Sequence, residues 1–372
     1  MLCSNVCENC VKERWIVDEF EKKWLVFAVA TVCLTIAIIS SFSVGNVVYP
    51  VKSILKNNEL KNNIAKNDEK CAINTNVDDI SPVVKNGARG GVCIEQSSRR
   101  VLVDEGKDER CYPASTTKIL TALIALEKLP LDRIVTVPKV AEGVEGSSIY
   151  LVEGDKISVE DLLFGLMLRS GNDAAVTLAV ECCGSVCEFA KVMNEKAREI
   201  GAKNSHFVNP HGLHDDNHYT TAYDLALICA NAYENDDFVR IASAKQRKIT
   251  VNDEARYIAN KNKLLKLFDG ANGVKTGFTK KSGRCLVGGA KRGDMQVVSV
   301  VLNHQDMWND TVRMLNFAFD NYQLIALDNA LFTNGKDVVR VEVKQTITPN
   351  WLDIKYPVKR DGSEKLEVKI VG

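Results

Sequence analysis

An uncharged run close to the start of the chain, residues 24–44, limits most strongly what this protein can fold into. Its 21 residues include no Asp, Glu, Lys or Arg. A helix rises about 1.5 Å per residue, so a run of this length matches the hydrocarbon core of a bilayer, which is roughly 30 Å thick. Helices buried inside soluble proteins rarely run this far without one charge. We therefore expect one N-terminal transmembrane helix.

A cleaved signal peptide is the alternative interpretation of the same run. Signal peptides have an apolar region of about 7–15 residues, whereas this run is longer and follows 23 other residues. The sequence therefore favours an uncleaved single-pass anchor, with residues 1–23 as a cytoplasmic tail. Basic residues are almost equally frequent on the two sides of the run, so charge alone does not decide its orientation.

The composition argues against one class of partners and suits a large folded domain. Lys and Arg total 48, and so do Asp and Glu, so no overall positive field favours nucleic acid. Hydrophobic residues make up 45% of the chain, which is enough for a sizeable core. The 12 cysteines are scattered, and a disulfide framework is not expected in a chain of this size. Cys3, Cys7 and Cys10 have a spacing that could hold a metal, but no fourth ligand is evident.

Changes in composition divide the rest of the chain into three segments. Residues 45–84 are rich in Asn, Lys and Asp and lack apolar periodicity, which predicts a stalk. Residues 85–325 are expected to form the main domain. Residues 326–372 include alternating segments such as Val338–Val343, which predict a small, incomplete β module.

Within residues 85–325, strand patterns stand at both ends and helix patterns lie between them. Short apolar runs joined by turn residues predict strands, whereas a segment that is apolar almost all round predicts a helix buried in the core. The simplest packing of this order is an α+β fold, in which one antiparallel sheet is covered by helices. The expected elements are a hairpin over 92–94 and 101–103, helices over 119–126, 158–184 (broken at 170–172) and 220–233, and strands over 273–277, 285–287 and 297–302.

Three short motifs occur in order along this domain: Ser115-x-x-Lys118, Ser170-x-Asn172 and Lys275-Thr276-Gly277. Each motif alone is common and could mark nothing more than a helix start, a loop between helices or the end of a strand. Their order and their expected structural contexts make the combination far more specific than any single motif.

The residue types in these motifs suit nucleophilic catalysis. Ser115 and Lys118 are three residues apart on a helix, so the amine can reach the hydroxyl. A serine hydroxyl becomes a good nucleophile only when a base removes its proton. Lysine is such a base when burial and a nearby cation, here Lys275, lower its pKa. Ser170 could relay a proton, the Asn172 amide could bind a substrate carbonyl, and the Lys-Thr-Gly strand could pair with an extended peptide.

Four segments of the chain closely resemble the D-alanyl-D-alanine carboxypeptidases, the low-molecular-weight penicillin-binding proteins. A closely similar trio of motifs marks penicillin-binding proteins and class A β-lactamases. The likeness covers about residues 85–320. The segments that carry it are 113–126, 146–175, 209–213 and 273–279.

The resemblance implies a fold and a set of catalytic roles. The fold would be like that of penicillin-binding proteins and β-lactamases, with an all-helical subdomain beside the sheet. Ser115 would be the acylated nucleophile, Lys118 its base, and Ser170 and Asn172 the second catalytic element. The backbone N–H groups of Ser115 and Phe278 would form the oxyanion hole. The reaction would remove the terminal D-alanine from peptidoglycan peptides through an acyl-enzyme.

The resemblance also implies how substrate is bound. The strand that binds substrate would contain Lys275, Thr276, Gly277 and Phe278. Lys261 is a further candidate to hold the terminal carboxylate, because the family often places a basic residue upstream of the Lys-Thr-Gly strand. A lysine there offers a point charge rather than the paired donors of an arginine.

The implied partners place the catalytic domain outside the cell. They are a stem peptide ending in D-Ala-D-Ala, β-lactam antibiotics as covalent inhibitors, and the membrane. No cofactor and no metal are implied. Because peptidoglycan lies outside the membrane, we expect a cell-membrane protein whose catalytic domain is extracellular.

Three other functions remain as alternatives. The pattern His211-x2-His214-x3-His218 suggests a zinc peptidase, but Pro210 and Gly212 make a helical presentation of the first histidine implausible. A class A β-lactamase uses an extra glutamate to activate water, and no Glu-x-x-Leu-Asn pattern occurs between the second and third motifs. An inactive cell-wall-binding protein would be expected to have lost at least one motif, whereas all three are intact.

Overall fold

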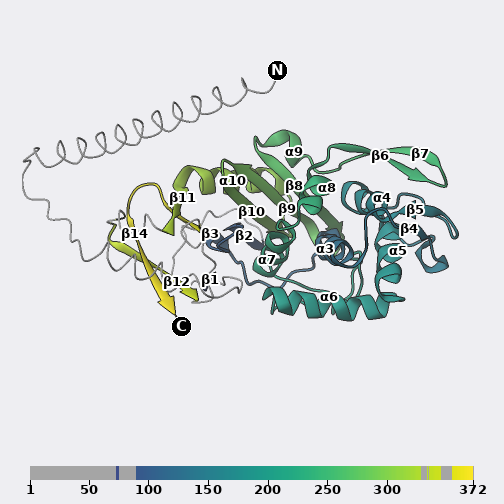
Figure 1. Cartoon of the computed structure of the whole chain (residues 1–372), viewed down its shortest axis with the longest axis horizontal. Helices are drawn as coiled ribbons and strands as arrows, with labels where there is room; N and C mark the ends of the chain where they lie inside the picture. Colours follow the sequence, from purple (N-terminus) through teal and green to yellow (C-terminus); the bar gives the residue numbers. More distant parts are fainter. Residues whose placement is uncertain (1–72, 75–88, 328–332, 334, 345–353, 372) are drawn as a thin grey trace, which may run out of the picture. The chain divides into compact units, whose positions relative to one another are not determined.

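The computed structural model of this protein describes residues 73–74, 89–327, 333, 335–344 and 354–371 (Figure 1). The expected cytoplasmic tail, the transmembrane helix over 24–44 and most of the expected stalk lie outside these residues and stay predictions. Within the described residues, none of the helices has the length and apolar character needed to cross a bilayer.

A five-stranded antiparallel sheet forms the centre of the main domain, as the sequence predicts. Its strands follow the order β3-β2-β10-β9-β8, so the hairpin from the start of the domain joins the strands from its end. Every pairing in this sheet is antiparallel. The strands are β2 (Gly90–Glu95), β3 (Val101–Glu105), β8 (Ala271–Thr279), β9 (Gly283–Arg292) and β10 (Met295–Leu302).

Helices cover both faces of this sheet. On one face α7 (Ala222–Ala232) packs against β2 and β10. On the other face α10 (Met307–Asn321) packs against β9 and β10. Alternate residues of each strand point to opposite faces, so Ile94 of β2 joins the core with α7, whereas Cys93 joins the core with α10.

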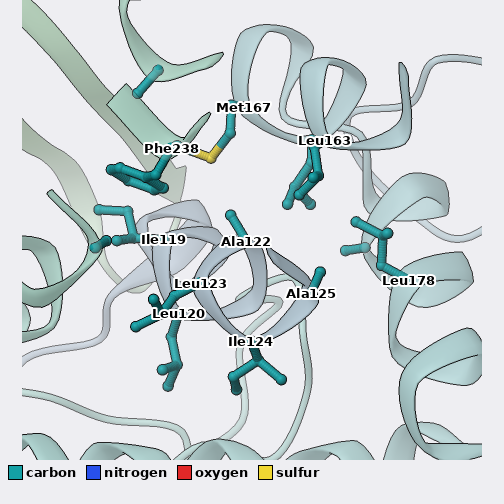
Figure 2. Packing of buried hydrophobic residues seen from close by; sticks show 14 of the residues in the cluster. Ile119, Leu120, Ala122, Leu123, Ile124, Ala125, Leu163, Met167, Leu178 and Phe238 are labelled. Atoms are coloured by element: carbon teal, nitrogen blue, oxygen red, sulfur yellow. The ribbon is translucent and has the colours of Figure 1, made fainter. Parts of the chain in front are cut away.

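The helix that follows the first motif lies in the interior of the domain. A 3₁₀ turn over Ala114–Thr117 leads directly into α3 (Lys118–Lys128). Figure 2 looks along α3 and shows its side chains pointing outward in several directions. They meet Leu163, Leu178 and Phe238 from three other helices. A helix that is apolar almost all round can be buried on every side, and the predicted core helix over 119–126 is confirmed.

The helices around α3 follow the predicted break. α4 (Val159–Phe164) is capped by the preceding residue Ser158, whose side chain accepts a hydrogen bond from the Asp161 backbone N–H. A π-helical turn over Gly165–Arg169 continues it and ends at Ser170. After this break come α5 (Asn172–Cys183) and α6 (Val186–Ile200), and α8 (Asp236–Ser243) follows α7.

A second sheet corrects the expectation of an all-helical subdomain. Four strands in the order β4-β5-β6-β7 pack beside α4 and the π-helical turn. β4 and β5 have only three residues each, with a single buried residue apiece, so they are too short for an alternating pattern to be recognised in the sequence. The strands are β4 (Ile134–Thr136), β5 (Lys156–Ser158), β6 (Gln246–Val251) and β7 (Glu254–Ala259).

Strands also form in the described part of the C-terminal segment. β11 (Tyr322–Ala326) starts before residue 326 and pairs with β13 (Lys355–Lys359). β12 (Asp337–Lys344) lies between β14 (Glu364–Val371) and β1 (Ile73–Asn74), and its pairing with β14 is parallel. β1 belongs to the segment predicted as a stalk, so two residues of that segment are part of a sheet.

Candidate active site

The three motifs meet at one cleft of about 370 Å³. Ser115, Ser170, Thr276 and Gly277 contribute to its lining, so each motif supplies at least one residue. The other members of the motifs are buried behind this lining. The full set of lining residues is Ser115, Ser147, Ser170, Lys261, Lys263, Thr276, Gly277, Phe278, Arg284, Met307 and Trp308.

Ser115 and Lys118 lie within hydrogen-bonding distance of each other. The 3₁₀ turn places Ser115 one turn before Lys118, and the Lys118 Nζ is 3.1 Å from the Ser115 Oγ. The same Nζ donates to Asn172 Oδ1 at 2.6 Å and to the His211 backbone carbonyl at 2.7 Å. The contacts with Asn172 and His211 therefore hold the Lys118 amine against the Ser115 hydroxyl.

Burial and charge both favour the neutral form of Lys118. Its side chain has no exposed surface. Burial holds the pKa of Lys118 well below its ordinary value of 10.5, and the positive charge of Lys275 lowers it further. The negative charge of Asp173 acts in the opposite direction without reversing the shift. Lys118 therefore lies where a neutral lysine can act as a base toward Ser115.

Lys275 is itself buried on strand β8. Its Nζ donates to the Thr276 backbone carbonyl at 2.8 Å. Burial lowers the pKa of Lys275 to about 7, with a smaller effect from the charge of Lys261. Near neutral pH this amine therefore exchanges its proton readily, so the field that it exerts on Lys118 depends on pH.

The second motif sits where the π-helical turn gives way to α5. Ser170 has a left-handed backbone conformation, with φ of 67°, and it lines the cleft. Asn172 begins α5, and its side chain connects Lys118 to the Glu145 backbone carbonyl. In this structure Oδ1 of Asn172 holds the lysine, and one N–H of the amide donates to the Glu145 carbonyl. The expected contact of this amide with a substrate carbonyl stays a prediction.

Strand β8 passes unusually close to the nucleophile. A Cβ added to Gly277 would lie 3.1 Å from the Ser115 backbone N and 3.0 Å from the Pro113 carbonyl oxygen. A side chain at this position would force the turn that carries Ser115 to shift by a few tenths of an ångström, and glycine avoids that shift. The next residue, Phe278, lies on the rim of the cleft with 62% of its surface exposed.

The loop over 209–213 supports the turn that carries Ser115, a role that the sequence analysis did not assign. Thr121 Oγ1 donates to the Pro210 carbonyl at 2.6 Å, which ties the loop to α3. Gly212 has φ of +85°, and a Cβ there would lie only 1.8 Å from the Ala114 carbonyl oxygen. The His211 carbonyl that receives Lys118 belongs to the same loop.

Two histidines of the zinc alternative, His211 and His218, contribute to this support. His218 is buried, its Nε2 is hydrogen-bonded to Thr117 Oγ1 at 2.8 Å, and its Nδ1 accepts from the Val208 N–H. Burial lowers the pKa of His218 to about 3, so the ring is neutral. With both ring nitrogens engaged, His218 cannot ligate a metal without breaking these bonds. Across the described segments of the chain, no three His, Cys, Asp or Glu side chains form a group that could hold a metal.

The cleft is positively charged on the side of Lys261. Lys261 Nζ donates to Ser147 Oγ at 3.1 Å, and burial lowers its pKa, with a smaller effect from Arg169. Lys263 and Arg284 also line the cleft, and the sequence analysis singled out neither. None of the described residues that line the cleft is acidic.

Comparison with known proteins gives one consistent result. A family model described as D-alanyl-D-alanine carboxypeptidase matches residues 79–306, which include all three motifs. The carboxypeptidase DacF of Bacillus subtilis is 34% identical over 267 residues, 69% of this chain and 68% of that protein. DacC of Escherichia coli is 34% identical over 64% of this chain and 62% of its own length. The structure of the Streptomyces K15 DD-transpeptidase has a TM-score of 0.60 at 32% identity and covers 63% of this chain and 97% of that one.

Proposed function

Because the chain belongs to the D-alanyl-D-alanine carboxypeptidase family, peptidase S11, we propose that it removes the terminal D-alanine from peptidoglycan stem peptides with Ser115 as its nucleophile. The observation that carries the proposal is the contact of 3.1 Å between the Ser115 hydroxyl and the buried Lys118 amine. Family membership makes the enzyme a penicillin-binding serine hydrolase. The contact with Lys118 supports the assignment of Ser115 as the serine that is acylated.

The hydrogen bonds of Lys118 suit a neutral amine. A neutral lysine has two N–H groups and one lone pair. Asn172 Oδ1 and the His211 carbonyl can accept the two N–H groups, which leaves the lone pair facing the Ser115 hydroxyl. In this state the Ser115 O–H donates to Lys118, so the proton is already directed toward its acceptor.

Acylation then proceeds by proton transfer and attack. Lys118 takes the Ser115 proton as Oγ bonds to the carbonyl carbon of the penultimate D-alanine. The resulting oxyanion would be stabilised by the backbone N–H groups of Ser115 and Phe278, and the close approach of β8 to Ser115 supports this pairing. The C–N bond breaks as Ser170 relays the proton from Lys118 to the leaving amine, which returns Lys118 to its neutral form. Water then attacks the ester, Lys118 accepts its proton and passes it to Ser115 Oγ, and the shortened peptide is released.

The terminal carboxylate of the substrate is assigned to the positive side of the cleft. Thr276 and Lys261 line that side, and Lys275 is buried behind it. A carboxypeptidase has to recognise this charge, and charge-assisted hydrogen bonds are the strongest means of doing so.

Mass spectrometry after penicillin treatment tests the nucleophile. The native protein should gain one penicilloyl group and Ser115→Ala none, whereas Ser243→Ala, a serine on α8 outside the cleft lining, should still be acylated. An adduct that survives in Ser115→Ala would refute the assignment. Release of D-alanine from a D-Ala-D-Ala peptide separates a peptidase from an inactive binder, and rapid penicillin turnover would instead identify a β-lactamase.

The protein is further proposed to be a single-pass membrane protein with its catalytic domain outside the cell. The uncharged run over 24–44 and the extracellular position of peptidoglycan support this arrangement. Protease added to intact protoplasts should remove the catalytic domain and leave a fragment that contains residues 1–44 in the membrane. Cleavage confined to residues 1–23 would reverse the orientation and contradict the proposed substrate.

A further inference from the structure

The cleft holds more positive charge than a terminal carboxylate requires. Lys261 and Thr276 suffice for that carboxylate, yet Lys263 and Arg284 also line the cleft. Both extra side chains belong to exposed residues. Neither forms an ion pair with any carboxylate among the described residues, and Arg284 has only the ring of Phe278 beneath it, at 5.8 Å. Two cations therefore face the cleft without a partner that would neutralise them.

The register of β8 and β9 shows on which side of the cleft these cations lie. Thr276 is opposite Leu286, and Phe278 is opposite Arg284, so these four side chains share one face of the sheet. Leu286 belongs to the core on the α10 side. Arg284 therefore projects toward the face that α10 covers, on the same side as the threonine assigned to the terminal carboxylate.

Residues from two other elements complete the same region. Lys263 directly precedes the short helix α9 (Leu264–Leu267), which packs against β8 and α10. Met307 and Trp308 open α10 and form an apolar wall. The cleft thus continues from the nucleophile, past Thr276, into a space with two cations and an apolar wall.

This space lies on the leaving-group side of the scissile bond. In the proposed reaction the terminal carboxylate belongs to the residue that leaves, and Thr276 and Lys261 hold it. The side chain of that same residue then lies next to its carboxylate, within reach of the extra cations. A methyl group, the side chain of D-alanine, uses neither the charge nor the length of this space.

We propose that Lys263 and Arg284 form a leaving-group subsite that accepts a terminal D-amino acid with an anionic side chain. The methylene groups of that side chain would pack on Met307 and Trp308, and its carboxylate would pair with the two cations. The inference rests on the proposed function, because it deepens the substrate class of the same active site. The reaction is unchanged: water cleaves the same amide bond, and the acidic D-amino acid leaves in place of D-alanine.

Four acylated peptides that differ only in the last residue test the subsite. They end in D-Ala followed by D-Ala, D-Glu, D-Gln or D-Lys, and kcat/KM is measured from release of the last residue. D-Glu and D-Gln have nearly the same shape, so their ratio isolates the charge. Exposed ion pairs are weak, so the two cations together should favour D-Glu over D-Gln by roughly two- to thirtyfold, and D-Lys should be the poorest substrate.

Matched variants identify the residues responsible. Lys263→Gln combined with Arg284→Gln should bring the D-Glu to D-Gln ratio close to one and leave release of D-Ala and acylation by penicillin near the native rates. Lys266→Gln, an exposed lysine of α9 outside the cleft lining, should keep the native ratio. Added salt should reduce the preference for D-Glu in the native enzyme, because salt screens exposed charges.

The outcomes separate the subsite from the function on which it rests. A native enzyme that releases D-Ala but does not prefer D-Glu over D-Gln overturns the subsite and leaves the proposed function intact. An undiminished preference in the double variant also overturns it, as does an equal loss in Lys266→Gln. If the native enzyme releases no D-Ala from the D-Ala-D-Ala peptide, the proposed function fails and the subsite fails with it.

Discussion

The ion pair between Arg100 and Glu364 is expected to contribute strongly to the stability of the domain. Arg100 follows the first strand of the central sheet, and Glu364 begins β14 near the end of the chain. Arg100 Nη2 donates to Glu364 Oε1 at 2.6 Å, and Nη1 donates to Oε2 at 3.0 Å. Both side chains are only 1% exposed. The guanidinium also lies over the rings of Tyr322 and Tyr356, at 5.2 and 5.5 Å from their centroids.

Glu364→Gln keeps the shape of the side chain and removes its charge. The buried guanidinium of Arg100 then loses the negative charge of Glu364. The Lys359 backbone N–H and ammonium group, which contact the same carboxylate, lose it too. Breaking a buried pair from one side costs about 3–5 kcal/mol. Exposed pairs contribute about 0–1 kcal/mol, so Asp237→Asn, which breaks the exposed pair with Arg240 on α8, should cost no more than that.

Urea unfolding of the native protein and the two variants measures these differences. A third variant, with methionine at both positions 100 and 364, should recover much of the loss, because well-packed apolar residues can replace a buried pair. The reasoning is refuted if Glu364→Gln loses no more stability than Asp237→Asn. It is also refuted if the double replacement is less stable than Glu364→Gln alone.

Three further predictions concern the active site. Gly212→Ala should abolish acylation by penicillin, because its Cβ would collide with the Ala114 carbonyl. Gly184 has a similar φ of +76° but open space around it, so Gly184→Ala should cost only about 1–2 kcal/mol of stability. An equal loss of acylation in the two variants would contradict this. Lys275→Met removes a cation that lowers the pKa of Lys118, so the pKa of this base should rise. In a plot of acylation rate against pH, the acid limb should then move to higher pH. A limb that stays in place or moves to lower pH would argue against Lys118 as the base. Lys261→Met should weaken cleavage of a free-acid D-Ala-D-Ala peptide and spare acylation by an ester that lacks the carboxylate, and an equal loss on both would assign Lys261 to the chemistry or the fold.

Local patterns were sufficient to predict the centre of the fold. The hairpin at the start of the domain, the buried helix after Ser115 and the strands that contain the third motif are encoded by continuous apolar runs. Their joining into one sheet followed from the rule that strands bury a shared face. Helix α6 was not assigned, although the spacing of the buried residues Phe189, Met193 and Ala197 would have indicated it.

The features that the sequence analysis missed depend on tertiary contacts. Lys263 and Arg284 belong to different elements, and only the packing of α9 and α10 against β8 and β9 brings them to one cleft. The pairing of Arg100 with Glu364 joins residues from opposite ends of the domain, and neither residue lies in a recognisable motif. The hydrogen bond from the Asn172 amide to the Glu145 carbonyl was not foreseen either, because Glu145 comes from a separate loop.

The strand order of the central sheet has a consequence for how the enzyme is made. β2 pairs with β10, so the sheet cannot close until the chain has been synthesised beyond Leu302. Contacts between residues so distant in sequence form slowly during folding, because a long loop has to be ordered first. Ser115 and Lys118 are made early, yet β8, which completes the cleft, is made more than a hundred residues later. Catalytic competence therefore requires β8, and a chain that stops before β8 has its nucleophile but no site in which to use it.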